Sequence, residues 1–304
     1  MTRVFLEKRN LELEYTTDCL VIREPEQAPR SLPLRKVNQV ICLHNAKITT
    51  QLIGQLHARG IDLVVLNLRY EKNSFALYAS QQKVVERRCK QYQWQACEET
   101  RMSLAKVWIR RKLIKTKRVI HLHQLPIQLH YLDGIDAKIH NPYLTEEQLR
   151  GLEGWMQHTL FEAWRSRVPD DLGFVKRVRR PPTDPINATL SLAYTFVYQE
   201  AIRQCKAAGL DSQLGFFHKA CFGRHSLACD LMETVRPKIE AWVFGLFLQG
   251  NLDKRHFTSS QNACLLGKKG RIVFYQEYES AWSGYSRELR AACSWLARTL
   301  DQDY

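Results

Sequence analysis

Hydrophobic residues in the first eighty positions occur in short runs that are rich in β-branched side chains. Between two of these runs, the stretch ITTQLIGQLHARG at 48–60 has apolar residues at helical spacing and ends in Gly60, a residue type that commonly follows a helix. Short β-branched runs predict strands, so this part of the chain is expected to be mostly β with one helix. The predicted strands are CLVI at 19–22, VNQVICL at 37–43, IDLVVLN at 61–67 and FALYAS at 75–80.

From about residue 82 the hydrophobic residues recur at the spacing of amphipathic helices. The first such segment is RMSLAKVWIRRKLIKTKRVIHLHQ at 101–124, in which the predicted core positions are Leu104, Trp108, Leu113 and Ile120. No internal repeat or low-complexity tract is visible in the sequence. The pattern predicts an α+β protein, with a small, mostly β N-terminal domain at 1–80 followed by a larger, all-α domain at 81–304.

The chain carries a formal net charge of +14 and has a sequence pI near 9.4. Clustered Lys and Arg residues gain affinity for nucleic acid by displacing its counterions, so this charge predicts a phosphate-rich partner. Two basic runs, KVWIRRKLIKTKR at 106–118 and FVKRVRRPP at 174–182, include Trp or Phe, as a groove that follows a phosphate backbone requires. Within these runs we predict that Lys112, Arg179 and Arg180 contact DNA or support the site.

The nine cysteines are scattered without a CxxC pair or regular spacing, which argues against a zinc ribbon or a disulfide framework. The opening residues, MTRVFLEKRNLELEY, lack the uninterrupted apolar run of a signal peptide. No stretch reaches the roughly eighteen consecutive apolar residues that a membrane-spanning helix needs. We therefore expect a cytoplasmic protein that does not act at a membrane.

Residues 215–237, GFFHKACFGRHSLACDLMETVRP, place ionisable side chains in a segment that otherwise has the composition of a buried helix. Asp230 and Glu233 are three residues apart, so on a helix their carboxylates share one face and can approach one divalent cation. His218 is predicted to come from a preceding turn or helix start. Carboxylates with an imidazole suit Mn²⁺ or Mg²⁺ better than a closed zinc site. The alternative is a solvated helix face with an ordinary polar contact.

A second acidic candidate is Glu153 in GLEGWMQHTLFEAW at 151–164, where Gly and Trp flank it on an otherwise apolar helix. It lies either near a helix start, where the dipole favours a carboxylate, or in the interior for a functional reason. Spacing alone does not separate a ligand from a surface residue here. Glu162 follows nine residues later, so it points about 180° away on a helix and is expected to face solvent.

Three segments of the chain carry recognisable motifs: RGLEGWMQHTLFEAW at 150–164, RRPPTDPINATLSLAYT at 179–195 and GLDSQLGFFHKACFGRHSLACDLMETVRP at 209–237. They resemble the signature motifs of the CRISPR-associated spacer-acquisition integrase family, in the same order and at matching spacing. Ser212, Cys229 and Thr234 depart from the family's usual residues but leave the candidate ligands untouched, whereas Gln157 and His158 replace an Ala-Arg pair. The resemblance covers about residues 145 to 245, and the N-terminal part is similar only in architecture.

The resemblance implies a divalent metal site in the helical domain. By position, Glu153, His218 and Glu233 correspond to the ligands of Mn²⁺ or Mg²⁺, and Asp230 corresponds to a neighbouring acidic residue important for activity. A cation would also explain why a core tolerates carboxylates whose unpaired burial is unfavourable by several kcal/mol. Further matches to the family pattern, expected to support the site or to contact DNA, are Asn187, Tyr194, Arg224, Ser226 and Arg236.

The same resemblance implies that the protein inserts captured DNA fragments into a CRISPR array. The 3′-hydroxyl of the fragment would attack a phosphodiester at the end of the repeat, a transesterification that needs no nucleotide cofactor. The expected partners are DNA, namely the captured fragment and the CRISPR repeat, a second copy of the chain bound through the β domain, and a smaller CRISPR adaptation subunit. Two alternatives stay open: a metal-dependent nuclease that acts on branched or single-stranded DNA in repair, and a non-catalytic DNA-binding scaffold.

Overall fold

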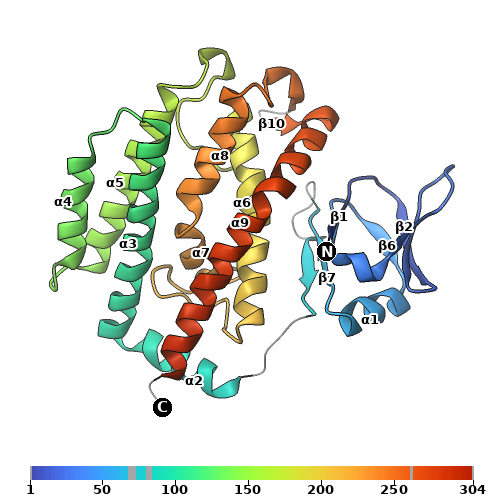
Figure 1. The fold of residues 1–304 in the computed structure, drawn as a ribbon, viewed down its shortest axis with the longest axis horizontal. Coiled ribbons are helices and arrows are strands. Elements are labelled where there is room, and N and C mark those ends of the chain that lie inside the picture. The colour runs from blue at the N-terminus through green and yellow to red at the C-terminus, as the bar shows by residue number, and fades with distance from the viewer. Residues whose placement is uncertain (1, 68–72, 80–83, 261–262, 303–304) are drawn as a thin grey trace. The chain divides into compact units, whose positions relative to one another are not determined.

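The computed structural model describes residues 2–67, 73–79, 84–260 and 263–302. The chain divides into two compact units, Met1–Lys83 and Val84–Tyr304, of which the first is rich in strands and the second in helices (Figure 1). The predicted α+β class, with a small, mostly β part before a larger helical part, is confirmed. The boundary predicted at residue 80 falls in the segment 80–83, which lies outside the described residues.

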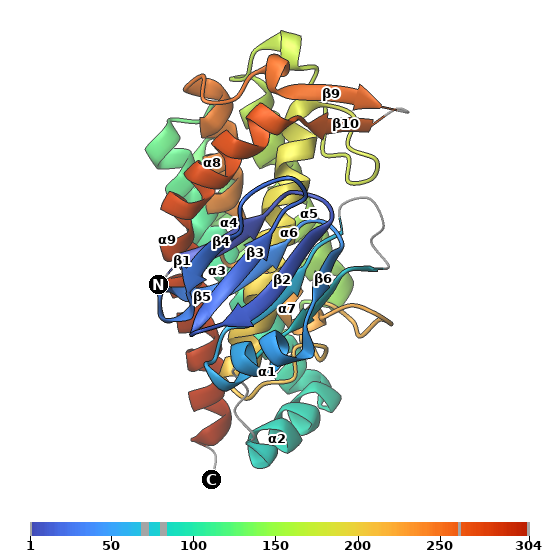
Figure 2. The ribbon, with the colours of Figure 1, turned by 90° about the vertical axis from the view of Figure 1, so that its right-hand side faces the viewer.

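The N-terminal unit contains two four-stranded sheets, seen in Figure 2. One has the strand order β1-β5-β7-β8, in which β5 pairs in parallel with β1 and β7 while β8 is antiparallel to β7. The other has the order β4-β3-β2-β6, with β6 parallel to β2. The elements are β1 (Thr2–Leu6), β2 (Leu11–Thr16), β3 (Cys19–Arg23), β4 (Arg30–Pro33), the 3₁₀ turn Leu34–Lys36, β5 (Val37–Cys42), β6 (Ala46–Ile48), α1 (Thr50–Ala58), β7 (Asp62–Val65) and β8 (Phe75–Leu77).

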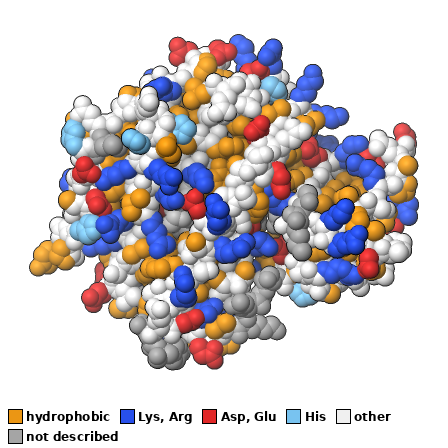
Figure 3. Space-filling view, viewed as in Figure 1, with side chains coloured by type: hydrophobic (Ala, Val, Ile, Leu, Met, Phe, Trp, Pro, Cys, Tyr) orange, Lys and Arg blue, Asp and Glu red, His pale blue; other side chains and the backbone are white. Residues whose placement is uncertain are grey.

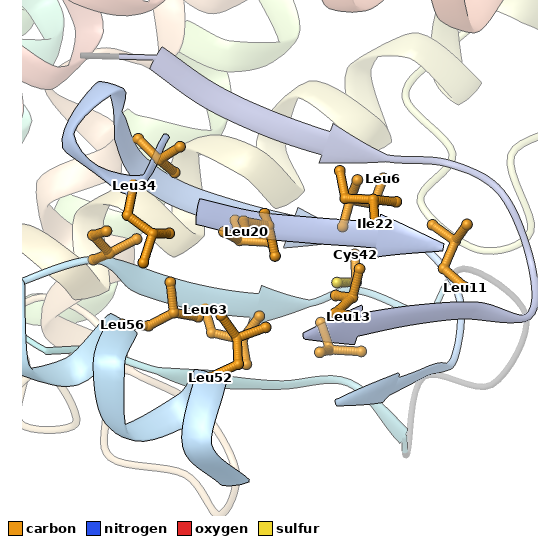
Figure 4. Packing of buried hydrophobic residues seen from close by; sticks show 14 residues of the cluster. Leu6, Leu11, Leu13, Leu20, Ile22, Leu34, Cys42, Leu52, Leu56 and Leu63 are labelled. Carbon is orange, nitrogen blue, oxygen red and sulfur yellow. The ribbon is translucent and has the colours of Figure 1, made fainter. Parts of the chain in front are cut away.

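A core of aliphatic side chains joins the sheets and α1 within this unit (Figure 4). On β2, Leu11 and Leu13 are buried while Glu12 and Glu14 are more exposed, as the alternation of side chains along a strand requires. Strand β5 is buried along almost its whole length, because it lies in the interior of its sheet with a strand on each side. Burial of this apolar surface is the main contribution to the stability of the unit.

All four predicted strands overlap observed strands, and the predicted helix is α1. The helix ends at Ala58, and Gly60 follows in the left-handed conformation at φ 70°, where glycine carries no steric penalty. Strands β1 and β2 were not predicted. In LELEYT the apolar residues alternate with glutamates, and in TRVFL the apolar run is only three residues long, so neither forms a continuous β-branched run.

The C-terminal unit is a bundle of helices interrupted by one hairpin (Figure 1). Helix α3 packs against α2, α4, α5, α7 and α8, and α6 packs against α7, α8 and α9. The elements are α2 (Val85–Ala96), α3 (Glu98–His123), α4 (Leu129–His140), α5 (Glu146–Arg165), the 3₁₀ turn Asp170–Leu172, α6 (Pro185–Ala207), α7 (Ser226–Glu233), α8 (Arg236–Leu248), the 3₁₀ turn Lys254–His256, β9 (Phe257–Ser260), β10 (Ala263–Leu266) and α9 (Lys268–Asp301).

Large aromatic side chains fill the core of the helical unit. Trp164 of α5 stacks on Phe244 of α8, with ring centroids 4.9 Å apart, and the Trp108 side chain of α3 packs edge-on against Trp295 of α9. The four core positions predicted on α3 are all buried. The antiparallel pair β9 and β10 was not predicted, since its strands are only four residues each.

Two further expectations concern the whole chain. All nine cysteines are free in the structure. Among the helices in the described ranges, none has the length and apolar character needed to cross a membrane.

Candidate active site

Two carboxylates from different helices converge on one buried ammonium group. Lys112 on α3 donates to Glu153 Oε1 of α5 and to Glu233 Oε2 at the end of α7, the second bond being 2.6 Å long. The side chains of Lys112 and Glu233 are only 1% and 3% exposed, whereas Glu153 is 20% exposed. The acidic pair is therefore largely enclosed, with Glu153 on the side that solvent reaches.

A second cation flanks Glu233. The Arg236 guanidinium, at the start of α8, lies 3.3 Å from Glu233 Oε1, three residues along the chain. Burial alone would raise the pKa of Glu233, but Arg236, Lys112 and the nearby His218 outweigh burial and lower that pKa to about 2. Glu233 is thus a carboxylate at every physiological pH. The effect of His218 on this pKa also places the imidazole within electrostatic reach of Glu233.

Asp230 holds His218 in place. The fully buried Asp230 carboxylate accepts His218 Nδ1–H at 2.8 Å. Because a carboxylate accepts but does not donate, Nδ1 carries a proton in this contact, and in the neutral imidazole the lone pair then lies on Nε2. The backbone N–H groups of Phe216, Phe217 and His218 also donate to Asp230, at 2.6, 3.0 and 2.8 Å. Asp230 therefore fixes both the loop that carries the histidine and the tautomer of its ring.

The loop approaches α7 too closely for a side chain at Gly215. A Cβ atom there would lie 2.8 Å from the Ser226 backbone carbon and 2.9 Å from Asp230 Oδ2. On the other side of His218, Ser226 donates to the Lys219 carbonyl at 2.9 Å, and Arg224 donates to the same carbonyl. These two residues, predicted as supports or DNA contacts, close the loop that leads from His218 into α7.

Tyr194 lies beside the site in a layer of charged groups. Its hydroxyl donates to Glu240 Oε1 at 2.5 Å, and its ring lies below the Arg236 guanidinium, 4.9 Å from it to the ring centroid. Burial raises the pKa of Tyr194, and the Glu240 carboxylate raises it further, so the phenol stays neutral. Gln157 donates to both Glu240 oxygens at 3.0 Å. Sequence reasoning missed Glu240, although a glutamate inside the apolar helix RPKIEAWVFGLFL was the signal that could have found it.

Asn187 anchors the second basic run to α6. Its side chain accepts from the Val178 N–H at 2.9 Å and donates to the Lys176 carbonyl at 2.9 Å, and it also accepts from Arg177. Asp184 caps the N-terminus of α6 by accepting from the Asn187 N–H at 2.8 Å. These contacts fix the backbone of the second basic run, in which the side chains of Arg179 and Arg180 are exposed to solvent.

We predict that Asn187→Ala loosens this basic segment, because the variant loses a fully buried amide and leaves its backbone partners unsatisfied. The expected loss in the free energy of unfolding is about 2–3 kcal/mol. Limited trypsin digestion should then cleave after Lys176, Arg177 and Arg179 much faster than in the wild-type chain. Asn251→Ala, which removes a polar contact to Glu277 elsewhere, is the control. Equal cleavage of the Asn187 variant and wild type would contradict the anchoring role.

The basic runs divide into buried and exposed parts. Lys112 is enclosed in the site, whereas Arg110 and Arg118 of the same helix are exposed. Figure 3 shows Lys and Arg side chains gathered over the helical unit on the face in view, with carboxylates between them. As expected, Glu162 is exposed, where it pairs with Arg165 one turn away at 3.2 Å.

The donor set near Lys112 fits a divalent cation in its chemistry. Across the ranges that the structure describes, no three His, Cys, Asp or Glu side chains form a ready-made metal-holding group. Glu153 and Glu233 nevertheless already share one cation, the Lys112 ammonium. Asp230 binds the Nδ1 atom of His218, so Nε2 is the ring nitrogen that could bind a metal. Carboxylate oxygens with one imidazole are ligands that Mn²⁺ and Mg²⁺ accept. The ligand assignment stays a prediction.

Comparison with known proteins gives consistent matches over nearly the whole chain. A family model described as "CRISPR associated protein Cas1" matches residues 4–280. The CRISPR-associated endonuclease Cas1 1 of Thermodesulfovibrio yellowstonii is 31% identical over 291 residues, which cover 92% of this chain and 91% of the relative. A casposase bound to integration product superposes with a TM-score of 0.87 at 19% identity, covering 100% of this chain and 92% of the other.

A Cas6-RT-Cas1–Cas2 complex contains a further similar chain, with a TM-score of 0.81 at 19% identity, covering 99% of this chain and 35% of the other. At such identities the solved structures establish a shared fold. The two-unit fold and the motifs around the acidic site place this chain among the CRISPR-associated proteins. Within that class, the chain belongs to the Cas1 family, as its sequence motifs predicted.

Proposed function

We propose that this protein is a divalent-metal-dependent DNA integrase of CRISPR adaptation, which joins captured DNA fragments to the CRISPR array. The observation that carries the proposal is the convergence of Glu153 and Glu233 on one cation, with His218 within electrostatic reach of Glu233. Carboxylates gathered in this way suit a metal that acts on phosphate, and the chain's charge of +14 suits DNA. Membership of the Cas1 family, whose curated relative is named an endonuclease, supports the same class of chemistry.

Glu153, His218 and Glu233 would hold the metal, which is Mn²⁺ or Mg²⁺ by ligand preference. When bound, such an ion polarises a phosphoryl oxygen and offsets the charge that develops on it. The chain's own residues prepare this site. Asp230 keeps the His218 lone pair on Nε2, and Arg236 keeps Glu233 ionised despite its burial.

The reaction we propose is attack of the fragment's 3′-hydroxyl on a phosphodiester at the end of the repeat. One P–O bond forms and one breaks; the attacking hydroxyl loses its proton to solvent, and the leaving 3′-oxygen takes up one proton from solvent. Exposed basic residues such as Arg110, Arg118, Arg179 and Arg180 would hold the two DNA segments near the site. No nucleotide cofactor is required, because the reaction replaces one phosphodiester bond by another of similar free energy.

The proposed partners are DNA, a second copy of the chain and a smaller CRISPR adaptation subunit. The similar casposase is bound to integration product, and the similar Cas1-containing complex includes Cas2. We assign the dimer contact to the N-terminal unit and the metal- and DNA-binding role to the helical unit. This division agrees with the placement of every candidate ligand in the helical unit.

We predict that a labelled DNA fragment with a free 3′-hydroxyl becomes joined to repeat-containing DNA in the presence of Mn²⁺ or Mg²⁺. The assay is gel analysis of strand transfer, run with and without the smaller subunit. A fragment with a 3′-dideoxy end should give no joined product, because it lacks the attacking oxygen, and EDTA should abolish the reaction. If the protein only degrades branched or single-stranded DNA and never joins the fragment, the repair-nuclease alternative is correct and integration is wrong.

A further inference from the structure

The site contains a lysine that is buried between the two predicted carboxylate ligands. Lysine is almost never fully buried unless its charge is paired, and Lys112 is paired twice, to Glu153 and to Glu233. These partners come from α5 and α7, while Lys112 comes from α3. Each carboxylate turns an oxygen toward the same Nζ atom. A single ammonium group therefore connects three helices at the centre of the site.

This ammonium and a divalent metal require the same carboxylate oxygens. A metal held by Glu153 and Glu233 would lie close to Nζ, and the two cations would repel each other strongly at that separation. Without any cation, the two carboxylates would repel each other in a largely buried setting, which is also unfavourable. Arg236 already pairs with Glu233, but the cation between the two carboxylates is either the Lys112 ammonium or the metal, so these two compete for that place.

We propose that Lys112 is a positioning residue that holds Glu153 and Glu233 together in the metal-free protein and is displaced when a divalent cation binds. This inference rests on the proposed metal site. Metal binding is then an exchange of one cation for another at the same two carboxylates. Lys112 stabilises the metal-free fold and, by the same contacts, weakens the binding of the metal.

The displaced ammonium has another buried carboxylate in its neighbourhood. Lys112 and Arg236 act electrostatically on the fully buried Glu240, although burial prevails and keeps the pKa of Glu240 raised. Glu240 already accepts hydrogen bonds from Tyr194 and Gln157. The electrostatic interaction with Glu240 would partly compensate the Lys112 charge after the lysine leaves the acidic pair.

Lys112→Met tests the exchange because methionine keeps much of the apolar stem and removes the charge. Mn²⁺ affinity is measured by the electron paramagnetic resonance signal of free Mn²⁺, and metal-free stability by thermal unfolding in EDTA. We expect the variant to bind Mn²⁺ about tenfold more tightly, since a unit charge a few ångströms from a divalent ion is worth at least that even at the dielectric of water. The same variant should melt at a lower temperature in EDTA.

The matched control is Lys115→Met on the same helix, which removes a lysine paired with Glu288 and should leave Mn²⁺ affinity unchanged. A Lys112→Met protein that binds Mn²⁺ with equal or lower affinity than wild type would overturn the exchange. A wild-type protein that binds no Mn²⁺ at millimolar concentration would instead overturn the proposed metal site. The two failures are therefore distinguishable.

A measurement on the wild-type chain covers the case in which Lys112→Met does not fold. Nitrogen-15 labelling of lysine side chains makes a buried, hydrogen-bonded ammonium visible by NMR, and Lys112→Arg identifies the Lys112 signal by its loss. Addition of Mg²⁺, which is diamagnetic, should shift this signal in proportion to metal occupancy and leave the Lys115 signal in place. A Lys112 signal that stays unchanged at saturating Mg²⁺ would overturn the displacement.

Discussion

Glu153→Gln is expected to lower metal-dependent strand transfer by about a thousandfold or more, while DNA binding changes by less than about twofold. The amide has nearly the same shape but supplies no negative charge to a divalent cation. A loss of this size corresponds to about 4 kcal/mol of transition-state stabilisation, as expected when metal activation of a phosphate is lost. Lys112 keeps Glu233 as a partner in this variant, so the helical unit stays folded.

Glu162→Gln is the matched control for this prediction. The residue lies on the same helix, nine positions later, and forms only an exposed ion pair with Arg165. Its replacement should leave strand transfer unchanged. Strand transfer is quantified by gel assay with Mn²⁺, and DNA binding by fluorescence anisotropy on the same samples. If Glu153→Gln retains wild-type turnover, the acidic pair has only a packing role and the proposed active site is wrong.

Asp230→Ala is expected to lower the free energy of unfolding of the helical unit by about 3–5 kcal/mol and to abolish strand transfer. The wild-type carboxylate is completely buried and accepts three backbone N–H groups and the His218 ring. Alanine leaves these donors without an acceptor in the interior. The loop that carries His218 then loses its anchor, so Mn²⁺ should not restore activity.

Urea unfolding followed by tryptophan fluorescence measures this effect selectively. All seven tryptophans lie between positions 94 and 295, so the signal reports on the helical unit alone. Asp171→Ala, which removes an exposed partner of Lys254, is the control and should shift stability by less than about 0.5 kcal/mol. An Asp230→Ala protein as stable as this control would show that the loop is held by other contacts.

The fold was predictable where apolar residues form regular patterns. Buried runs such as VNQVICL, and the periodic spacing of Leu104, Trp108, Leu113 and Ile120, each predict one element type without ambiguity. The short hairpin of β9 and β10 lacked such a pattern. Strand β1 contains an arginine, Arg3, that is buried in the fold, and a charged residue of this kind breaks the apolar run on which a strand prediction depends.

The candidate site was only partly accessible to sequence reasoning. The order of the motifs suggested that Glu153, His218 and Glu233 form one metal site. In the structure, Glu153 and Glu233 contact one cation, and His218 is within electrostatic reach of Glu233. The identity of that cation was not predictable. Lys112 stands in a basic run whose charge suggested a DNA-facing surface, and only the packing of α3 against α5 and α7 turns it inward.

The role of Asp230 also depends on tertiary structure. Its spacing from Glu233 suggested a shared helix face and joint approach to one ion. In the fold, its carboxylate is occupied by the backbone of residues 216–218 and by the His218 ring, so it supports the histidine. A sequence gives no sign of such contacts, because they arise between residues that are twelve to fourteen positions apart in an irregular loop.

A crystal structure of the protein soaked with Mn²⁺, with the ion located by its anomalous scattering, tests the central claim most directly. We expect one manganese peak that contacts carboxylate oxygens of Glu153 and Glu233 and the Nε2 atom of His218, with the Lys112 ammonium moved away from the acidic pair. Absence of manganese from these three side chains at saturating concentration, with Lys112 still between the carboxylates, would contradict it.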